Sequence, residues 1–293
     1  MRIDIPDIDQ ADILDACIDN MDDSDRKTRL TNCKSDIVTF SQHYAKVAEK
    51  GALNGEAAVE NGCIGEIQKE DMVFLYDGRL VKSKKGRFYY DKIKSNAPYG
   101  ICPFCGHREV DTLDHYLPKA IFFQYAVTKE NLVPACSKCN KNKMTEVPEN
   151  RAKETIHPYY DDFDDEVWLV ADINMDAGEP FGFSFYVCKP DSWTEEKYQR
   201  AENHMKVFKL KKLFRVLAAA DISKELKSFA KLYGRTRDFD IVRAHVEDLC
   251  NVERDENRNS WKAAMYQCLY DSEWMWNDFF SDYTEEYLDS RKL

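Results

Sequence analysis

Residues 102–143 contain most of the side chains in this sequence that could perform chemistry. Four of them are cysteines in two closely spaced pairs: Cys102, Cys105, Cys136 and Cys139. The Cys-x-x-Cys spacing lets two thiolates face one ion, and four thiolates complete the tetrahedron of a structural zinc site. The sequence therefore predicts a structural Zn²⁺ that fastens both ends of this stretch.

Between and beside the cysteine pairs lie residues that suit hydrolysis of a phosphodiester. His115 can act as the general base, because an unperturbed imidazole is mostly neutral near neutral pH. Asp114 and Asn140 offer the oxygen ligands that Mg²⁺ or Mn²⁺ accepts. Asn131 can hold the strand or the imidazole in place through its amide hydrogen bonds.

The net charge of −11 at first opposes a nucleic-acid substrate, because a polyanion is held by Lys and Arg. Basic residues are nevertheless concentrated in two runs, residues 79–94 and 206–215. Such segregation can present local basic surface on an acidic chain. Beside the predicted site, Lys119 and Lys143 are candidates for substrate binding through phosphate, with a solvated charge as the equal alternative for each.

The spacing of apolar residues indicates the elements that must position this site. Residues 1–60 have mainly helical periodicity and no chemical motif, which favours a scaffold or a docking segment. Residues 61–98 hold glycines between short runs and mix basic with aromatic residues, which suits either a nucleic-acid-facing surface or packed rings under a solvated face. Residues 110–117 alternate as a strand does, and a helix can begin near Cys136.

The remainder of the chain shows two further patterns. The runs 167–173 and 181–187 predict a β-hairpin, and residues 194–232 and 239–289 predict helices. The high aromatic content of the last range is more typical of a core than of a cofactor site, because large rings dominate burial.

Three motifs around the cysteine pairs, LDHYLPK, ENLVP and CxxCNxxK, resemble the HNH (ββα-metal or His-Me finger) endonuclease family. The resemblance covers about residues 100–145. It implies that His115 activates water, that Asp114 ligates the catalytic metal and that Asn131 orients the catalytic loop. The third signature position falls on Asn140, so the site resembles an H-N-N version that still offers a metal-binding oxygen.

A longer frame, from YYDKIK to HPYYDD, is similar to HNH proteins of bacterial antiphage defence, such as the HNH subunit of the Septu system. This similarity implies antiviral defence as the setting and an ABC-type ATPase as a partner. His157, in HPYYDD, is expected to be a packed or capping histidine, because no spacing connects it to the core.

We therefore expect an α+β fold: a ββα-metal HNH core stapled by the four-cysteine zinc site, flanked by an N-terminal helical segment and a C-terminal β-hairpin plus helical region. The expected domains are 1–69, 70–150 and 151–293. The expected function is metal-dependent cleavage of DNA, with RNA as an open alternative. The rival interpretations are a non-catalytic zinc knuckle that binds nucleic acid or protein, and a nuclease that a partner releases from latency.

The first residues carry acidic side chains where a signal peptide would need basic ones, and no run approaches the ~18 apolar residues of a membrane span. We therefore expect a cytoplasmic protein without membrane attachment. The six cysteines outside the pairs are then expected to be reduced thiols.

Overall fold

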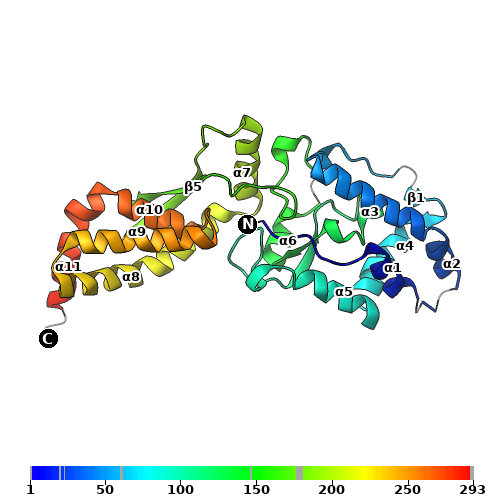
Figure 1. Cartoon of the computed structure of the whole chain (residues 1–293), viewed down its shortest axis with the longest axis horizontal. Helices are drawn as coiled ribbons and strands as arrows, with labels where there is room; N and C mark the ends of the chain where they lie inside the picture. Colours follow the sequence, from blue (N-terminus) through cyan, green and yellow to red (C-terminus); the bar gives the residue numbers. More distant parts are fainter. Residues whose placement is uncertain are drawn as a thin grey trace. The chain divides into compact units, whose positions relative to one another are not determined.

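The computed structural model of this chain describes residues 2–19, 21–22, 24–59, 62–145, 147–175 and 181–290. Packing divides the chain into two compact units, Met1–Phe163 and Asp164–Leu293 (Figure 1). The three domains expected from the sequence, 1–69, 70–150 and 151–293, remain a prediction. In the described part of the chain, no helix combines the length and the apolar character needed to cross a bilayer.

The first unit begins with helices α1 (Gln10–Ile18), α2 (Ser24–Asn32) and α3 (Lys34–Glu49). Asp9 starts α1, because its carboxylate accepts a hydrogen bond from the Ala11 amide at 2.8 Å. A 3₁₀ turn, η1 (Leu53–Gly55), and a two-stranded ribbon, β1 (Cys63–Ile64) with β2 (Ile67–Gln68), connect these helices to the next group.

Residues 69–94 are helical, which the glycine-interrupted pattern did not reveal. Helix α4 (Lys69–Phe74) continues into the π-helical η3 (Leu75–Leu80), and α5 (Lys84–Lys94) follows. Gly86 lies inside α5 because the helix passes close to η3: a Cβ there would lie 2.2 Å from the Arg79 carbonyl oxygen. The glycine therefore marks a close helix crossing rather than a break in structure.

The predicted ββα core is confirmed. Strand β3 (Thr112–His115) pairs antiparallel with β4 (Leu132–Ala135), and α6 (Ser137–Lys143) follows. The register places Asp114 opposite Val133 and His115 opposite Leu132. Short 3₁₀ turns complete this region: η4 (Pro98–Gly100), η5 (Phe123–Tyr125), η6 (Lys129–Asn131) and η7 (Arg151–Lys153).

One hydrophobic core joins the N-terminal helices to the ββα core. It includes Leu14 from α1, Leu75 from η3, Ile93 from α5 and Leu113 from β3, all at most 2% exposed. Because these apolar groups are buried against one another, the helices before residue 95 form the walls of the ββα core.

The second unit contains the predicted hairpin, β5 (Leu169–Asn174) with β6 (Gly182–Val187), while residues 176–180 of its connection lie outside the described residues. Its helical elements are α7 (Glu195–Val207), α8 (Leu210–Thr236), α9 (Phe239–Glu256), α10 (Trp261–Asp271), η9 (Met275–Phe279) and α11 (Phe280–Asp289). Lys209 adopts a left-handed conformation and separates α7 from α8. The rings of Trp261, Tyr266 and Phe280 are buried, as the sequence predicted.

Candidate active site and zinc centre

The four paired cysteines come together in the first unit. One ligand atom from each of Cys102, Cys105, Cys136 and Cys139 lies within 4.8 Å of all the others, and all four residues are buried. Backbone amides donate to two of the sulfurs at 3.4 Å, from Arg108 to Cys105 and from Cys139 to Cys136. This set of donors fits a structural zinc ion with no open position.

Hydrogen bonding among the four thiols moves their pKa values apart: those of Cys102 and Cys139 are raised, and those of Cys105 and Cys136 are lowered. Hydrogen bonding from Cys102 lowers the pKa of both the Cys105 and the Cys136 thiol. Cys136 also begins helix α6, where its sulfur accepts the amide of the first turn. The zinc centre therefore fixes the start of the helix that carries Asn140.

Asp114 is buried in β3, with 3% of its surface exposed. The Lys143 ammonium lies 2.9 Å from Asp114 Oδ2, yet this oxygen accepts no hydrogen bond of good geometry from the described residues. Burial raises the pKa of Asp114, and the nearby Lys143 charge opposes that rise. A buried carboxylate oxygen without a well-aligned donor fits a hard divalent cation.

Lys143 lies in the last turn of α6 and is itself buried, at 7% exposure. Its ammonium also donates to the His115 carbonyl oxygen at 2.8 Å and lies 5.5 Å from the centre of the Tyr116 ring. In this arrangement Lys143 is the counter-ion of Asp114. A lysine that binds phosphate is expected to be exposed, and Lys143 is buried.

His115 ends β3 and presents a partly exposed imidazole. Its Nε2 lies 2.9 Å from the carbonyl oxygen of Ala126, and because a carbonyl only accepts, Nε2 must carry the proton. The lone pair is therefore on Nδ1. Burial lowers the pKa of His115 to about 3, the charges of Lys119 and Lys143 lower it further, and the bond to Ala126 opposes them. The ring is neutral at neutral pH.

Asn131 is completely buried at the end of η6. Its Oδ1 accepts from the Leu117 amide at 2.7 Å, and its Nδ2 donates to the carbonyls of Leu117 at 3.0 Å and Tyr125 at 3.1 Å. These bonds join the end of the loop between β3 and β4 to its beginning at Leu117 and its middle at Tyr125. Since Ala126, the acceptor for His115, directly follows Tyr125, Asn131 fixes the partner of the imidazole.

Asn140 lies in the first half of α6 and is half-buried. Its Nδ2 donates to the carbonyl oxygen of Leu113 at 3.3 Å, which ties α6 to the residue before Asp114. The amide oxygen of Asn140 can serve as a metal ligand beside that strand.

Lys119 lies on the loop that follows β3 and is partly exposed. Its ammonium forms an ion pair with Asp77 of η3 and lies 4.3 Å from the centre of the Tyr76 ring. Its charge reaches the imidazole, because it contributes to the lowered pKa of His115. Of the two candidate lysines, Lys119 is the more exposed, and its role in substrate binding stays a prediction.

His157 is buried and packed, as the sequence predicted. Its Nδ1 accepts from the Tyr159 amide at 3.2 Å, its Nε2 lies 3.1 Å from the Tyr44 hydroxyl, and its ring lies 4.0 Å from that of Tyr116. Both nitrogens have partners, so His157 supports the wall behind β3.

Tyr76, which the sequence analysis did not identify, touches the predicted base. Its ring lies 4.4 Å from the His115 ring at an interplanar angle of 66°, an edge-to-face contact. Tyr76 precedes the HNH-like stretch, and no motif marks it. Only the helical continuation through η3 brings it to the site.

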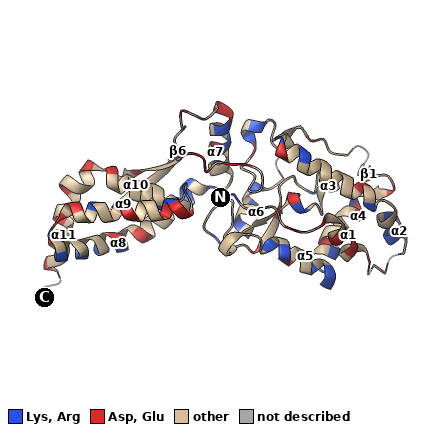
Figure 2. Ribbon diagram, viewed as in Figure 1, with Lys and Arg blue, Asp and Glu red and all other residues tan. Residues whose placement is uncertain are grey.

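The basic run at residues 79–94 forms exposed surface on α5, whereas acidic residues occur on α1 (Figure 2). Phe88 on α5 is 63% exposed, but the Tyr90 ring is buried, and its hydroxyl accepts from the Leu113 amide at 3.3 Å. Packing of an aromatic ring is therefore confirmed for Tyr90, while a nucleic-acid-facing surface on this helix stays a prediction. In the second unit, the basic side chains of 206–215 are also exposed.

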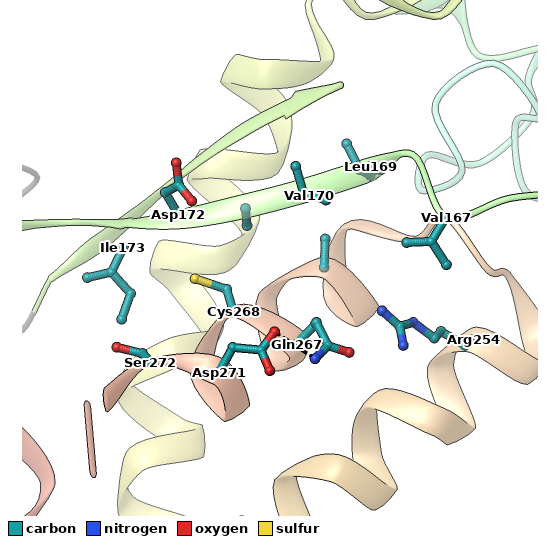
Figure 3. Close-up of a pocket in the computed structure, with 12 residues that line it drawn as sticks. Val167, Leu169, Val170, Asp172, Ile173, Arg254, Gln267, Cys268, Asp271 and Ser272 are labelled. Carbon is teal, nitrogen blue, oxygen red and sulfur yellow. Dashed lines mark hydrogen bonds between the residues drawn. The ribbon is translucent and has the colours of Figure 1, made fainter. Parts of the chain in front are cut away.

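The second unit contains a hollow of about 350 Å³ between β5 and α10, shown in Figure 3. Arg254 of α9 lines one end, and Asp271 lies among the polar residues of α10. Burial raises the pKa of Cys268 in this hollow to about 12, so its thiol stays protonated and is a poor nucleophile. No residue of the predicted nuclease site lines it.

Comparisons with known proteins agree with this geometry. The HNH endonuclease family model matches residues 102–146, which contain the zinc centre, Asp114, His115, Asn131 and Asn140. Protein ea31 of Escherichia phage lambda is 33% identical over 233 residues, which cover 74% of this chain and 76% of that protein. No solved structure matches the chain. With its ββα core, its four-cysteine cluster and this relative, the chain belongs to the HNH endonuclease family.

Proposed function

We propose that this protein is a metal-dependent endonuclease that hydrolyses phosphodiester bonds in DNA, with His115 as the general base. The observation that carries the proposal is the tautomer of His115. The bond from Nε2 to the Ala126 carbonyl leaves the lone pair on Nδ1, where a base needs it. HNH membership already implies a nucleic-acid substrate.

The other residues of the site have complementary roles in this proposal. Asp114 and Asn140 would hold Mg²⁺ or Mn²⁺, and such an ion, when bound, supplies positive charge to the phosphate and to the leaving oxygen. Asn131 keeps the catalytic loop closed, and Lys119 attracts the phosphate. Lys143 balances the charge of Asp114 from inside the fold.

The lowered pKa of His115 has a consequence for catalysis. A base whose pKa is near 3 accepts protons poorly, but an anion close to an imidazole favours its charged form and raises its pKa. A bound phosphodiester brings that anion. His115 therefore gains basicity when the substrate arrives, while it stays neutral in the unbound protein.

DNA as the substrate, rather than RNA, is part of the proposal. The exposed lysines on α5 provide sequence-independent attraction for either polymer. The antiphage role and the ABC-type ATPase partner remain predictions from the resemblance to Septu proteins. The lambda relative is itself a phage protein and gives them no support.

Plasmid cleavage with Mg²⁺ or Mn²⁺ tests the proposal. His115→Ala should lower the single-turnover rate by roughly 10²–10⁴-fold, the usual contribution of a general base. His43→Ala is the matched control, because His43 is an exposed histidine of the same unit that pairs with Glu56. Zinc content and the thermal midpoint should be equal in all three proteins.

Two outcomes would contradict this assignment. Equal cleavage by wild type and His115→Ala would exclude His115 as the base. No cleavage of DNA or RNA by a zinc-loaded, folded wild type would contradict a nuclease that acts alone and would favour the two alternatives, a latent subunit that needs a partner or a non-catalytic zinc knuckle. Parallel reactions with single- and double-stranded DNA and RNA identify the substrate.

A further inference from the structure

The contact between Tyr76 and His115 joins the predicted base to a part of the chain outside the HNH stretch. Tyr76 lies in η3 and is only 7% exposed, and its ring meets the imidazole edge-to-face at 4.4 Å. The family match begins at residue 102, so η3 belongs to the sequence before it.

Three contacts along α4 and η3 hold the catalytic loop. Lys69 donates to the carbonyl oxygen of Ala120, Asp77 pairs with Lys119, and Tyr76 packs on His115. His115 is the last residue of β3, and Lys119 and Ala120 lie in the loop that follows it and that Asn131 closes. The segment 69–80 and Asn131 thus hold this loop through separate sets of contacts.

The segment is itself anchored. At its start, the Asp71 carboxylate accepts from Arg26 at 2.9 Å and from Arg29 at 3.0 Å, both on α2. At its end, Arg79 donates to the Cys17 carbonyl oxygen at 2.9 Å. A support fixed at both ends can define the orientation of a ring packed against it. Short π-helical segments of this kind occur often at functional sites.

We propose that Tyr76 is a positioning residue for the His115 imidazole, and that segment 69–80 is part of the active site. Its ring blocks rotation of the imidazole, so that Nε2 stays on the Ala126 carbonyl and Nδ1 stays directed to the substrate. The proposal rests on the proposed role of His115 as the base. It makes the N-terminal helices a component of catalysis rather than only a docking module.

The aromatic ring, rather than the hydroxyl, carries this role. Within the described part of the chain, the hydroxyl of Tyr76 makes no hydrogen bond, whereas its ring contacts both His115 and the Lys119 ammonium. Tyr76→Phe should therefore behave as the wild type, and Tyr76→Leu should lose the function. Tyr89→Leu is a matched control, because Tyr89 is a partly buried tyrosine that packs on Phe88 of α5 instead.

The first readout is the tautomer of His115, measured in the full chain by ¹⁵N–¹H NMR of the imidazole and assigned with His115→Ala. Wild type, Tyr76→Phe and Tyr89→Leu should show protonated Nε2 alone. Tyr76→Leu should show averaging between both tautomers. An unchanged single tautomer in a folded, zinc-loaded Tyr76→Leu would overturn the proposal.

The second readout is single-turnover cleavage of DNA. Tyr76→Leu should lower the rate roughly 10- to 100-fold, the scale expected for a misplaced catalytic group, with DNA affinity unchanged. In a His115→Ala background, the same substitution should cause no further loss. Additive losses, or a loss confined to DNA affinity, would contradict positioning. If wild type cleaves nothing, the proposed function fails, while the tautomer readout still decides the role of Tyr76.

Discussion

Asn131→Ala should destabilise the first unit selectively. The substitution removes three hydrogen bonds of a completely buried amide, two to Leu117 and one to Tyr125. A buried hydrogen bond contributes about 1 kcal/mol net, and the backbone groups left without partners cost more than that. We therefore expect a loss of at least ~3 kcal/mol in the free energy of unfolding.

The assay must separate the two units. The five tryptophans, Trp168, Trp193, Trp261, Trp274 and Trp276, all lie in the second unit, so their fluorescence reports its unfolding alone. Unfolding of the first unit can be followed by zinc release into a coloured chelator during a urea titration. Asn131→Ala should lower the urea midpoint of zinc release and leave the tryptophan transition in place.

Two further variants sharpen the test. Asn140→Ala removes one 3.3 Å bond of a half-buried amide, and we expect it to cost under about 1 kcal/mol. Asn131→Asp keeps the acceptor for Leu117 but turns a carboxylate oxygen towards two buried carbonyl oxygens, so its loss should be at least as large as that of Asn131→Ala. Amide exchange at Leu117 should accelerate in Asn131→Ala, since Oδ1 protects that proton. A loss no larger than that of Asn140→Ala would refute the view that Asn131 closes the loop.

Three other predictions follow from the site. Burial lowers the pKa of His115 to about 3, and a general base acts in its unprotonated form. As the pH is lowered, kcat/KM should therefore stay constant to well below pH 6.5. A fall of kcat/KM to half its plateau value near pH 6.5 would contradict this. Lys143→Met breaks a buried ion pair and should lower the free energy of unfolding by ~3 kcal/mol in the zinc-release assay. Lys141→Met, at an exposed position of the same helix, should change it by no more than about 0.5 kcal/mol. Equal urea midpoints for the two variants would contradict the ion pair. Cys139→Ser should abolish zinc binding and cleavage but leave the tryptophan transition unchanged, and full activity without zinc would refute the structural role.

The sequence predicted the parts of the site whose chemistry is local. Two cysteine pairs at fixed spacing predict a metal cluster wherever the fold places them, and the cluster is confirmed. The strand that carries Asp114 and His115, and the helix that carries Asn140, follow from alternation and from the turn at Cys136. Such features depend on neighbours within a few residues.

Other parts depend on contacts between distant segments, and a sequence pattern does not contain them. From the sequence, a lysine near the site is interpreted as a phosphate ligand or a solvated charge. Lys143 is instead buried against Asp114, because the last turn of α6 lies beside β3. Tyr76 precedes the HNH-like motifs, and nothing in the sequence around it indicates contact with the site. The helices at 69–94 were missed because Gly86 serves a close helix crossing, a role that composition alone does not distinguish from a turn.

Burial acts on the two central neighbours in opposite directions. It raises the pKa of Asp114 and lowers that of His115, since it disfavours a charge on either group. An opposite charge would favour the charged form of each group: a cation beside Asp114 and an anion beside His115. On the proposed function, the cation is the divalent metal ion and the anion is the phosphodiester. The Lys143 ammonium already places a positive charge beside Asp114, so a divalent ion must compete with it. The negative charge beside His115 would come from the substrate. On the proposed function, the His115 imidazole would become a stronger base when DNA is bound, and it is uncharged before.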